Sequence, residues 1–306
     1  MKNLFAVGAL AALVLPFASS AQAVREAIIT AETTFAAQAA REGIKVAFLA
    51  NSSPTGLVAE DGKLLNAQAL WTARPAQPDS RLSWHPVWAD VAQSGDLGYT
   101  TGPWTAFVKE RPQASGEYVT VWRKQPDGTL KFAVNVGVER VGVAAPKVTV
   151  VPQPRLMAAV ATPSAAPTNV LIDLDNRFSK AELLKPGATY QQFLSSEARL
   201  YRTGLSMMKG EAAVANMKNL EGRYIFATTG GYLAAAGDLG YVVGTVRREA
   251  GAKYPEENGT YLRIWRREEV AGWRIVLEIF NFEPGQVVTP VAGTGPVGPA
   301  QTKRPQ

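Results

Sequence analysis

The sequence predicts an α+β protein of two tandem, related domains, each with helices first and a curved antiparallel sheet after them. One observation is a duplication. Ser-Gly-Asp-Leu-Gly-Tyr at residues 94–99 returns as Ala-Gly-Asp-Leu-Gly-Tyr at residues 236–241, so that Asp96 and Asp238 are 142 positions apart. The other is the spacing of apolar residues: in each copy they first recur at helical intervals and then, further along the chain, at every second residue. A repeat this long indicates a duplicated domain, because solenoid units have about 20–50 residues.

The duplication extends well beyond this motif. Gly-Glu-Tyr-Val-Thr-Val-Trp-Arg-Lys at residues 116–124 matches Gly-Thr-Tyr-Leu-Arg-Ile-Trp-Arg-Arg at residues 259–267, with an offset of 143. The apolar helical positions Ile28 and Phe35 recur as Leu171 and Phe178 at the same offset. Three anchors spread over about a hundred positions indicate two copies of one fold.

The elements follow from hydrophobic periodicity. Each copy opens with an amphipathic helix, at residues 25–41 and 168–185, because apolar side chains recur at i, i+3 and i+7. Shorter helices are expected at residues 44–49, 62–72, 189–194 and 210–220. Alternation of period two predicts strands at residues 82–91, 97–109, 116–123 and 130–138, and at residues 224–235, 239–248, 259–266 and 273–281.

The chain divides into five segments. The first, residues 1–23, has a cation at Lys2, a short apolar run and Ala-Gln-Ala at its end, which predicts a signal peptide cleaved after Ala23 and a periplasmic or secreted protein. A membrane anchor is the alternative, but the apolar run is shorter than the roughly 20 residues of a spanning helix. The other segments are a first domain (24–140), a Pro/Ala-rich linker (141–167), a second domain (168–284) and a disordered tail (285–306).

Composition narrows the chemistry. The chain has no cysteine and one histidine, so disulfides, thiolate metal sites and cysteine nucleophiles are excluded, and neither a metal nor a cofactor is expected. The net charge is +6, but Lys and Arg are interspersed with Asp and Glu, as on an ordinary solvated surface. Nucleic acid is therefore not an expected partner, and neither is stable membrane insertion.

Two motifs carry a resemblance to a known family. A long helix and two short ones are followed by Gly-Asp-Leu-Gly-Tyr-x-x-Gly and then by Gly-x-Tyr-x-x-x-Trp-Arg-(Lys/Arg). This order resembles the nuclear transport factor 2-like (NTF2-like) superfamily, in particular a bacterial branch beside the SnoaL-like cyclases and the ketosteroid isomerases. The resemblance implies cone-shaped domains, each with a pocket between its bent sheet and its helices. It also implies pairing through the outer sheet faces, so the two copies are expected to form a pseudodimer within the chain, with a homo-oligomer left open.

Aromatic side chains on one face of a strand either line such a pocket or fill a core, and both alternatives stay open. Arg74, near Trp71, either holds an anionic ligand at the pocket mouth or is a solvated loop residue. The candidate ligand-binding residues are Trp71, Arg74, Trp84, Trp88, Tyr99, Trp104, Tyr118, Trp122, Asn135, Tyr241, Tyr261 and Trp265.

Two residues are candidate catalytic bases. Glu278, which corresponds to Asn135 in the first copy, is a polar residue on an otherwise apolar strand. His85 lies between Trp84 and Trp88, which strand alternation predicts to share one face of the strand while His85 projects from the other. A strand or edge histidine without function is the alternative. Asp96 and Asp238 are expected to form turns, since Gly-Asp suits a tight turn.

The leading functional expectation is binding of a small apolar or amphipathic molecule, or a scaffold role. Some relatives carry an Asp shortly after the second helix, whereas this chain has Asn-Ser-Ser at residues 51–53 and Ser-Ser-Glu at residues 195–197. That departure weakens the alternative, a cofactor-free isomerase, cyclase or hydrolase with Glu278 or His85 as base. A third hypothesis is that one domain only completes the pseudodimer.

Overall fold

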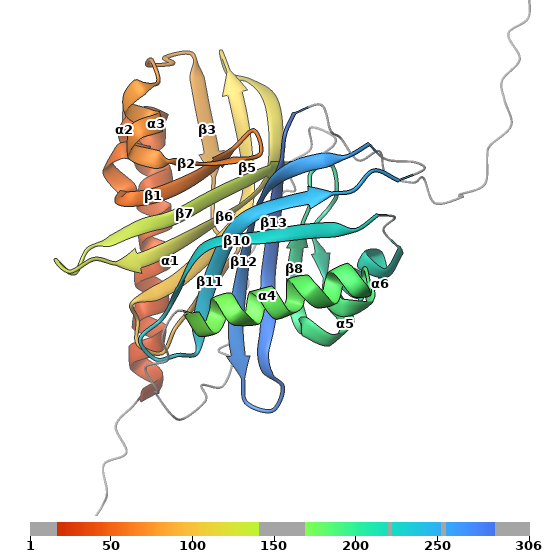
Figure 1. Ribbon diagram of the computed structural model, residues 1–306. Helices are drawn as coiled ribbons and strands as arrows, with labels where there is room; N and C mark the ends of the chain where they lie inside the picture. The colour runs from red at the N-terminus through yellow and green to blue at the C-terminus, as the bar shows by residue number, and fades with distance from the viewer. Residues whose placement is uncertain (1–16, 141–168, 220–221, 252–254, 285–306) are drawn as a thin grey trace, which may run out of the picture.

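The computed structural model describes residues 17–140, 169–219, 222–251 and 255–284. It confirms the predicted fold class: two curved, open sheets, each with its own helices (Figure 1). The predicted linker and tail, and the first 16 residues of the predicted signal peptide, lie outside the described residues. No helix in the described ranges combines the length and apolar character needed to cross a membrane.

The first domain runs from α1 to β7. Its helices are α1 (Phe17–Glu42), α2 (Ile44–Asn51) and α3 (Ala67–Ala73). Its strands are β1 (Ser52–Glu60), β2 (Lys63–Asn66), β3 (Ser80–Trp84), β4 (Trp88–Val91), β5 (Leu97–Val108), β6 (Arg111–Lys124) and β7 (Leu130–Glu139). They form a sheet in the order β2-β1-β7-β6-β5-β3, and β4 also pairs with β5.

The second domain runs from α4 to β13. Its helices are α4 (Asn169–Leu184), α5 (Ala188–Phe193) and α6 (Gly210–Asn219). Its strands are β8 (Leu194–Tyr201), β9 (Met208–Lys209), β10 (Tyr224–Leu233), β11 (Leu239–Arg248), β12 (Glu257–Glu268) and β13 (Gly272–Phe282). The order in this sheet is β10-β11-β12-β13-β8-β9.

Each sheet contains two strands that the sequence pattern did not reveal, β1 and β2 in the first domain and β8 and β9 in the second, and β2 occupies the start of the segment predicted as a helix at residues 62–72. β1 pairs with β7, and β8 pairs with β13, in parallel rather than antiparallel orientation. Both pairings include a register shift, between Ser52 and Leu57 in β1 and between Leu194 and Arg199 in β8. These irregularities interrupt the alternation of period two, which is the signal that marks a strand in a sequence.

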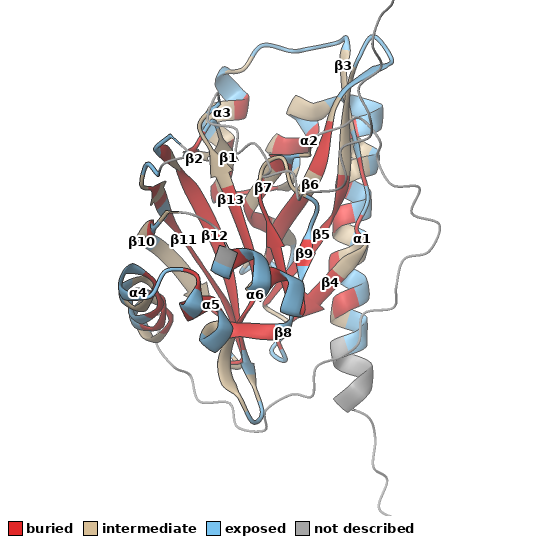
Figure 2. Cartoon of the chain, turned by 90° about the vertical axis from the view of Figure 1, so that its right-hand side faces the viewer, coloured by how far each residue is buried: buried red, intermediate tan, exposed pale blue. Residues whose placement is uncertain are grey.

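Three apolar clusters hold the molecule together. In the first domain, α1 to α3 cover the concave sheet face around Phe35 and Trp122, and in the second α4 to α6 do the same around Phe178 and Trp265. The third cluster lies between the two sheets and draws residues from both domains. Figure 2 shows the buried strands between α1 on one side and α4, α5 and α6 on the other.

The duplicated turns contact one another. Gly95 and Gly237 have φ angles of 69° and 68°, a conformation that glycine adopts without strain, so the predicted turns are present. Their carboxylates also reach across to the other copy. Asp96 accepts hydrogen bonds from the Tyr232 hydroxyl at 2.8 Å and the Ala235 N–H at 3.2 Å, while Asp238 accepts one from the Gln93 N–H at 3.1 Å.

Candidate functional site

A cavity of about 320 Å³ lies in the first domain, between the concave sheet face and α2. Its volume is within the range of about 300–1,000 Å³ that is usual for small-molecule sites. The lining is mostly apolar and aromatic and consists of Phe48, Ala59, Glu60, Leu82, Trp84, Trp104, Tyr118, Asn135 and Gly137.

Four of the predicted ligand-binding residues meet in this cavity: Trp84, Trp104, Tyr118 and Asn135. They come from strands β3, β5, β6 and β7, so only the folded sheet brings them together. Their shared face agrees with the pairing of Tyr118 with Gly137, since directly paired residues project to the same side of a sheet.

Trp71 and Arg74 do not line the cavity, but Arg74 is bonded to a residue that does. Arg74 Nη2 donates to both carboxylate oxygens of Glu60, at 2.6 and 2.5 Å, and the guanidinium stacks over the Trp71 ring at 4.6 Å. Glu60 itself lines the cavity. Arg74 is thus already paired with a carboxylate and is not free to hold an anion without breaking that pair.

Two glycines allow the Trp104 indole to lie flat on the sheet. A Cβ at Gly116 would come within 2.8 Å of the Trp104 ring, and one at Gly137 would lie 3.5 Å from its Nε1. The indole N–H is fixed by donation to the Glu117 carbonyl at 3.1 Å. Trp104 therefore forms a rigid wall of the cavity.

The cavity has few polar groups. Asn135 Nδ2 donates to Thr120 Oγ1 at 3.0 Å. The Tyr118 hydroxyl is buried near Thr100 but has no hydrogen bond of normal geometry to the described part of the chain. Burial raises the pKa of Tyr118 well above its usual value, so the phenol is neutral and can donate to a bound molecule.

Behind this wall lies Glu32 of α1, a residue that the sequence reasoning missed. Its carboxylate is fully buried and accepts hydrogen bonds from Trp84 Nε1 at 2.6 Å, Trp122 Nε1 at 2.9 Å and Thr100 Oγ1 at 2.5 Å. Burial raises the pKa of Glu32, and these hydrogen bonds oppose the rise. A signal was present, because Glu32 is one helical turn after Ile28 on the apolar face of α1.

The second domain places charged side chains at the corresponding positions. Asp175 of α4, 143 residues after Glu32, accepts hydrogen bonds from Tyr261 Oη at 2.6 Å, Arg263 Nη1 at 2.5 Å and Trp265 Nε1 at 3.1 Å. Arg263 also donates through Nε to Glu278 at 2.7 Å. Tyr261 and Trp265, which were predicted to bind a ligand, are thus committed to Asp175.

Glu278, the predicted base, is completely buried and bound on several sides. Besides Arg263, it forms an ion pair with Arg202, and the Tyr190 hydroxyl donates to it at 2.9 Å. Its carboxylate oxygens are thus committed to two guanidinium groups and a phenol. The catalytic assignment remains a prediction.

The strand pairings show which residues of the two domains correspond. Gly137 pairs with Tyr118 as Phe280 pairs with Tyr261. Phe280 is fully buried, lies 5.2 Å from the Tyr224 ring centroid and carries the Arg202 guanidinium over its face at 3.5 Å. A phenyl ring and an ion-pair cluster thus occupy the part of the second domain that corresponds to the first-domain cavity.

The remaining candidates lie elsewhere. His85 is exposed, in the segment between β3 and β4. The expectation that Trp84 and Trp88 share a face is wrong, because the three residues 85–87 lie opposite only two residues of β5, which reverses the alternation. Trp84 is in the first-domain core, whereas Trp88 packs on the cluster between the sheets. Tyr99 and Tyr241 belong to that same cluster, and Trp122 belongs to the first-domain core.

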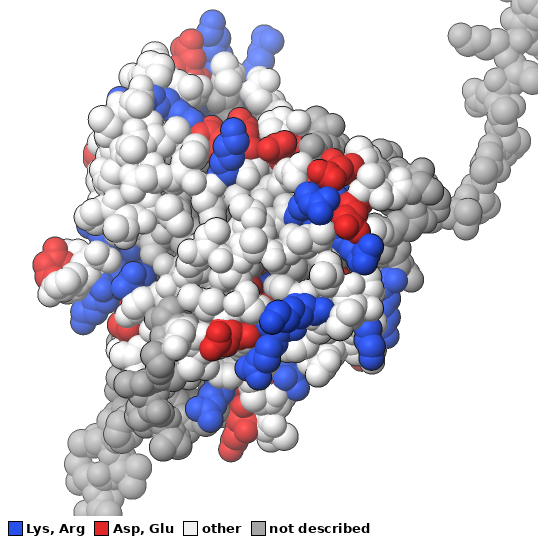
Figure 3. Space-filling view, viewed as in Figure 1, with Lys and Arg blue, Asp and Glu red and all other residues white. Residues whose placement is uncertain are grey.

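Within the described ranges, no group of three or more His, Asp or Glu side chains has the arrangement of a metal site. Acidic and basic side chains are interspersed on the face shown in Figure 3, as the sequence predicts.

No protein-family model and no curated protein matches this sequence. Solved structures do match. An NTF2-like protein from Pseudomonas putida KT2440 is 18% identical with a TM-score of 0.32, and the match covers 39% of this chain and 88% of that one. An NTF2-like superfamily protein from Salmonella enterica is 13% identical with a TM-score of 0.31, covering 42% and 96%. A ketosteroid isomerase-like protein from Erwinia carotovora atroseptica is 14% identical with a TM-score of 0.30, covering 37% and 94%.

By fold, this chain is similar to the NTF2-like proteins. The resemblance stated from the sequence motifs is confirmed at that level, and the two sheet-centred domains fit a tandem arrangement of NTF2-like cones. At these identities the likeness concerns the fold alone.

Proposed function

We propose that the first domain binds a small apolar or amphipathic molecule in its cone, and that the second domain is its filled structural counterpart. The observation that carries the proposal is the exchange of Gly137 for Phe280 at corresponding positions. Glycine leaves room beside Trp104, and the first cone contains a cavity. Phenylalanine at the corresponding place packs against Tyr224, Phe226 and Arg202.

Two further differences between the domains, at positions near Gly137 and Phe280, also favour an open first cone and a filled second one. Glu60 corresponds to Arg202 and Asn135 to Glu278, and in the second domain these two residues form a buried ion pair. This pair places two charged groups that already face each other in the part of the second cone that corresponds to the first-domain cavity. Since neither Glu278 nor His85 lines the first-domain cavity, binding is the function that we propose.

We also infer that the two domains form a pseudodimer within the chain. The outer sheet faces pack through a shared apolar cluster, and the duplicated turns exchange hydrogen bonds. Arg266 of the second domain is paired with Asp90 of the first. The corresponding arginine of the first domain, Arg123, stacks at 3.6 Å on Tyr232 of the second, which is the residue that corresponds to Asp90. A periplasmic or secreted location remains part of the proposal and rests on residues 1–23 alone.

Gly137→Phe tests the binding function. The added ring should fill the first cone as Phe280 fills the second, since a Cβ at Gly137 meets only an ordinary contact with Trp104. Native mass spectrometry of the full chain purified from its host should show a retained small molecule that the variant lacks, and titration with 2-naphthylmethanol should show binding only to the unsubstituted chain.

The matched control is Gly251→Phe, because a Cβ at Gly251 meets no atom within 4 Å. This variant should bind like the unsubstituted chain. Binding of 2-naphthylmethanol by Gly137→Phe, or no binding by the unsubstituted chain, would contradict the proposed site.

A further inference from the structure

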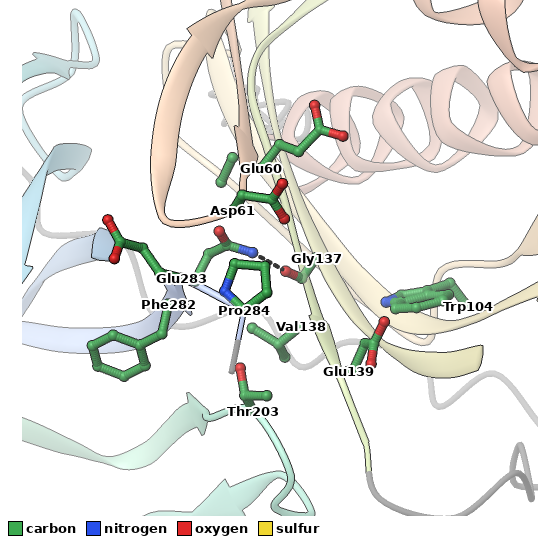
Figure 4. A pocket seen from close by; sticks show the side chains of 12 residues that line it. Glu60, Asp61, Trp104, Gly137, Val138, Glu139, Thr203, Phe282, Glu283 and Pro284 are labelled. Atoms are coloured by element: carbon green, nitrogen blue, oxygen red, sulfur yellow. Dashed lines mark hydrogen bonds between the residues drawn. The ribbon is translucent and has the colours of Figure 1, made fainter. Parts of the chain in front are cut away.

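A second cavity, of about 360 Å³, adjoins the first (Figure 4). The two share Ala59, Glu60, Trp104 and Gly137 in their linings, so they lie next to each other. The second cavity is bounded by both domains, and we call it the vestibule. It is lined by Ala59, Glu60, Asp61, Trp104, Gly137, Val138, Glu139, Thr203, Asn281, Phe282, Glu283 and Pro284.

The charged side chains that line the vestibule are all carboxylates. Glu60 is paired with Arg74, but Asp61, Glu139 and Glu283 form no ion pair with the described part of the chain. Among the described residues that line either cavity there is no Lys, Arg or His, although the whole chain has a net charge of +6. The lining of this site is therefore acidic in an otherwise basic protein, which favours a cationic ligand group.

An aromatic face lies in the same row of the sheet. Trp104 pairs with Gly116, and Gly116 pairs with Glu139, so the indole and the Glu139 side chain project from the same face on either side of a glycine. A cation over an indole face and beside a carboxylate is attracted by both groups. Trp104 also lines the inner cavity, so this position is where the two cavities join.

An independent observation points to a ligand in the inner cavity. Tyr118 is 4% exposed, lines the cone, and its hydroxyl lacks a well-formed hydrogen bond to the described residues. A buried hydroxyl without a partner is costly, and a polar atom on a bound molecule removes that cost. The rest of the inner lining is largely apolar, which suits a flat hydrophobic body.

We propose that the ligand of this chain is an amphipathic organic cation. Its apolar body occupies the first cone, and its ammonium or related cationic group lies in the vestibule against Trp104, Asp61 and Glu139. This assignment rests on the proposed binding function and adds the chemical class of the ligand.

The test compares three probes that share one apolar body: (2-naphthylmethyl)trimethylammonium, 2-naphthylmethanol and 2-naphthoate. Each is titrated into the full chain at low ionic strength and followed by fluorescence. The cation should bind about tenfold more tightly than the alcohol, given one cation–π contact and two or three solvated charge pairs. The anion should bind more weakly than the alcohol, and added salt should reduce these differences.

The diagnostic variant is the triple substitution Asp61→Asn, Glu139→Gln and Glu283→Gln. Asn suits position 61, whose φ of 48° lies in the left-handed region. The preference for the cation should fall to about twofold or less while affinity for the alcohol is unchanged. The control triple Glu211→Gln, Glu256→Gln and Glu269→Gln removes the same charge from exposed sites outside both cavities and should keep the preference.

The outcomes separate the two proposals. Equal binding of the three probes, tighter binding of 2-naphthoate, or a preference that survives the vestibule substitutions would overturn the cation assignment alone, provided that Gly137→Phe still blocks 2-naphthylmethanol. If the alcohol fails to bind or binds Gly137→Phe equally well, the binding function itself fails.

Discussion

At the scale of single residues, the two domains stabilise a buried carboxylate at the same helical position in different ways. Glu32 is bound by neutral donors, two indole N–H groups and a hydroxyl, and its pKa is raised by burial. Asp175 is bound by a guanidinium group as well as by hydroxyl and indole donors. Because these donors are neutral, Glu32 brings no guanidinium group into the first-domain core, and the lining of the nearby cavity is largely apolar.

Glu182 gives the second domain a pH dependence. Burial raises the pKa of its carboxyl to about 7, against the Gly187 N–H that donates to Oε1 at 2.7 Å. Because the folded pKa lies above the unfolded value, the folded state holds the proton between about pH 4.5 and 7, and stability falls as the pH rises through that window. The loss is at most about 1.4 kcal/mol per pH unit for one group.

Glu182→Gln should remove this slope. The amide keeps an oxygen for Gly187 and carries no charge, so the variant should gain stability over the unsubstituted chain at pH 8 but not at pH 4.5. Urea unfolding at both pH values measures the difference, and contributions from other carboxyls such as Glu257 cancel because both chains contain them. Parallel pH curves for the two chains would refute the assignment, and the exposed Glu211→Gln serves as control.

At the scale of elements, short irregular segments decide where side chains point. The three-residue segment between β3 and β4 reverses the alternation, so that Trp84 faces the cone and Trp88 the other sheet. The Gly-Asp turns also position side chains, in this case across the contact between the two domains. Each joins two strands of its own sheet and also presents a carboxylate to the opposite turn.

Asp96→Ala should loosen the opposite turn rather than only its own. Loss of the bonds to Ala235 and Tyr232 should increase amide exchange at Ala235 and reduce stability by about 1 kcal/mol. Hydrogen exchange measured by mass spectrometry tests this. Asp127→Ala is the matched control, because the hydrogen bonds of Asp127 to described residues are to Thr129 in its own turn, and its effect should stay there. Exchange that increases only around position 96 would contradict the cross-domain role.

At the scale of the whole molecule, the apolar cluster between the sheets makes the domains interdependent. This cluster includes valines of β6 and β7 and aliphatic residues of β12 and β13, all nearly inaccessible to solvent. A buried ion pair lies beside it: Arg266 of β12 donates to both carboxylate oxygens of Asp90 in β4, at 2.8 and 2.7 Å. Separation of the sheets would expose both the apolar faces and this pair.

Arg266→Met should destabilise the whole chain by about 3–5 kcal/mol, because it leaves the Asp90 charge buried without its partner. Arg267→Met, one residue further and exposed, should change stability by less than about 0.5 kcal/mol. Thermal unfolding followed by near-ultraviolet circular dichroism compares them. Similar midpoints for the two variants would show that the pair contributes little to the contact between domains.

Much of the fold could be predicted because it depends on local periodicity. The long helices, the regular strands β5 and β11 and the duplication are read directly from side-chain spacing. The parallel strands β1 and β8 could not be predicted in this way, since their register shifts break the alternation. Of the candidate site, Trp84, Trp104, Tyr118 and Asn135 were identified from strand patterns, but not their convergence in one cavity.

The sequence alone determined that there are two copies of an α+β unit and which positions correspond, because homologous spacing survives in the chain itself. Only the tertiary structure placed a cavity beside Gly137 and packed rings around Phe280. Gly137 and Phe280 both fit an alternating strand pattern as uncharged, non-polar residues. Their difference in size matters only in the folded protein, where β7 and β13 curve toward the helices. Glu32 likewise gains its role from indoles 52 and 90 residues away. Contacts at such separations are set by the packing of the sheet on its helices, which no local pattern encodes.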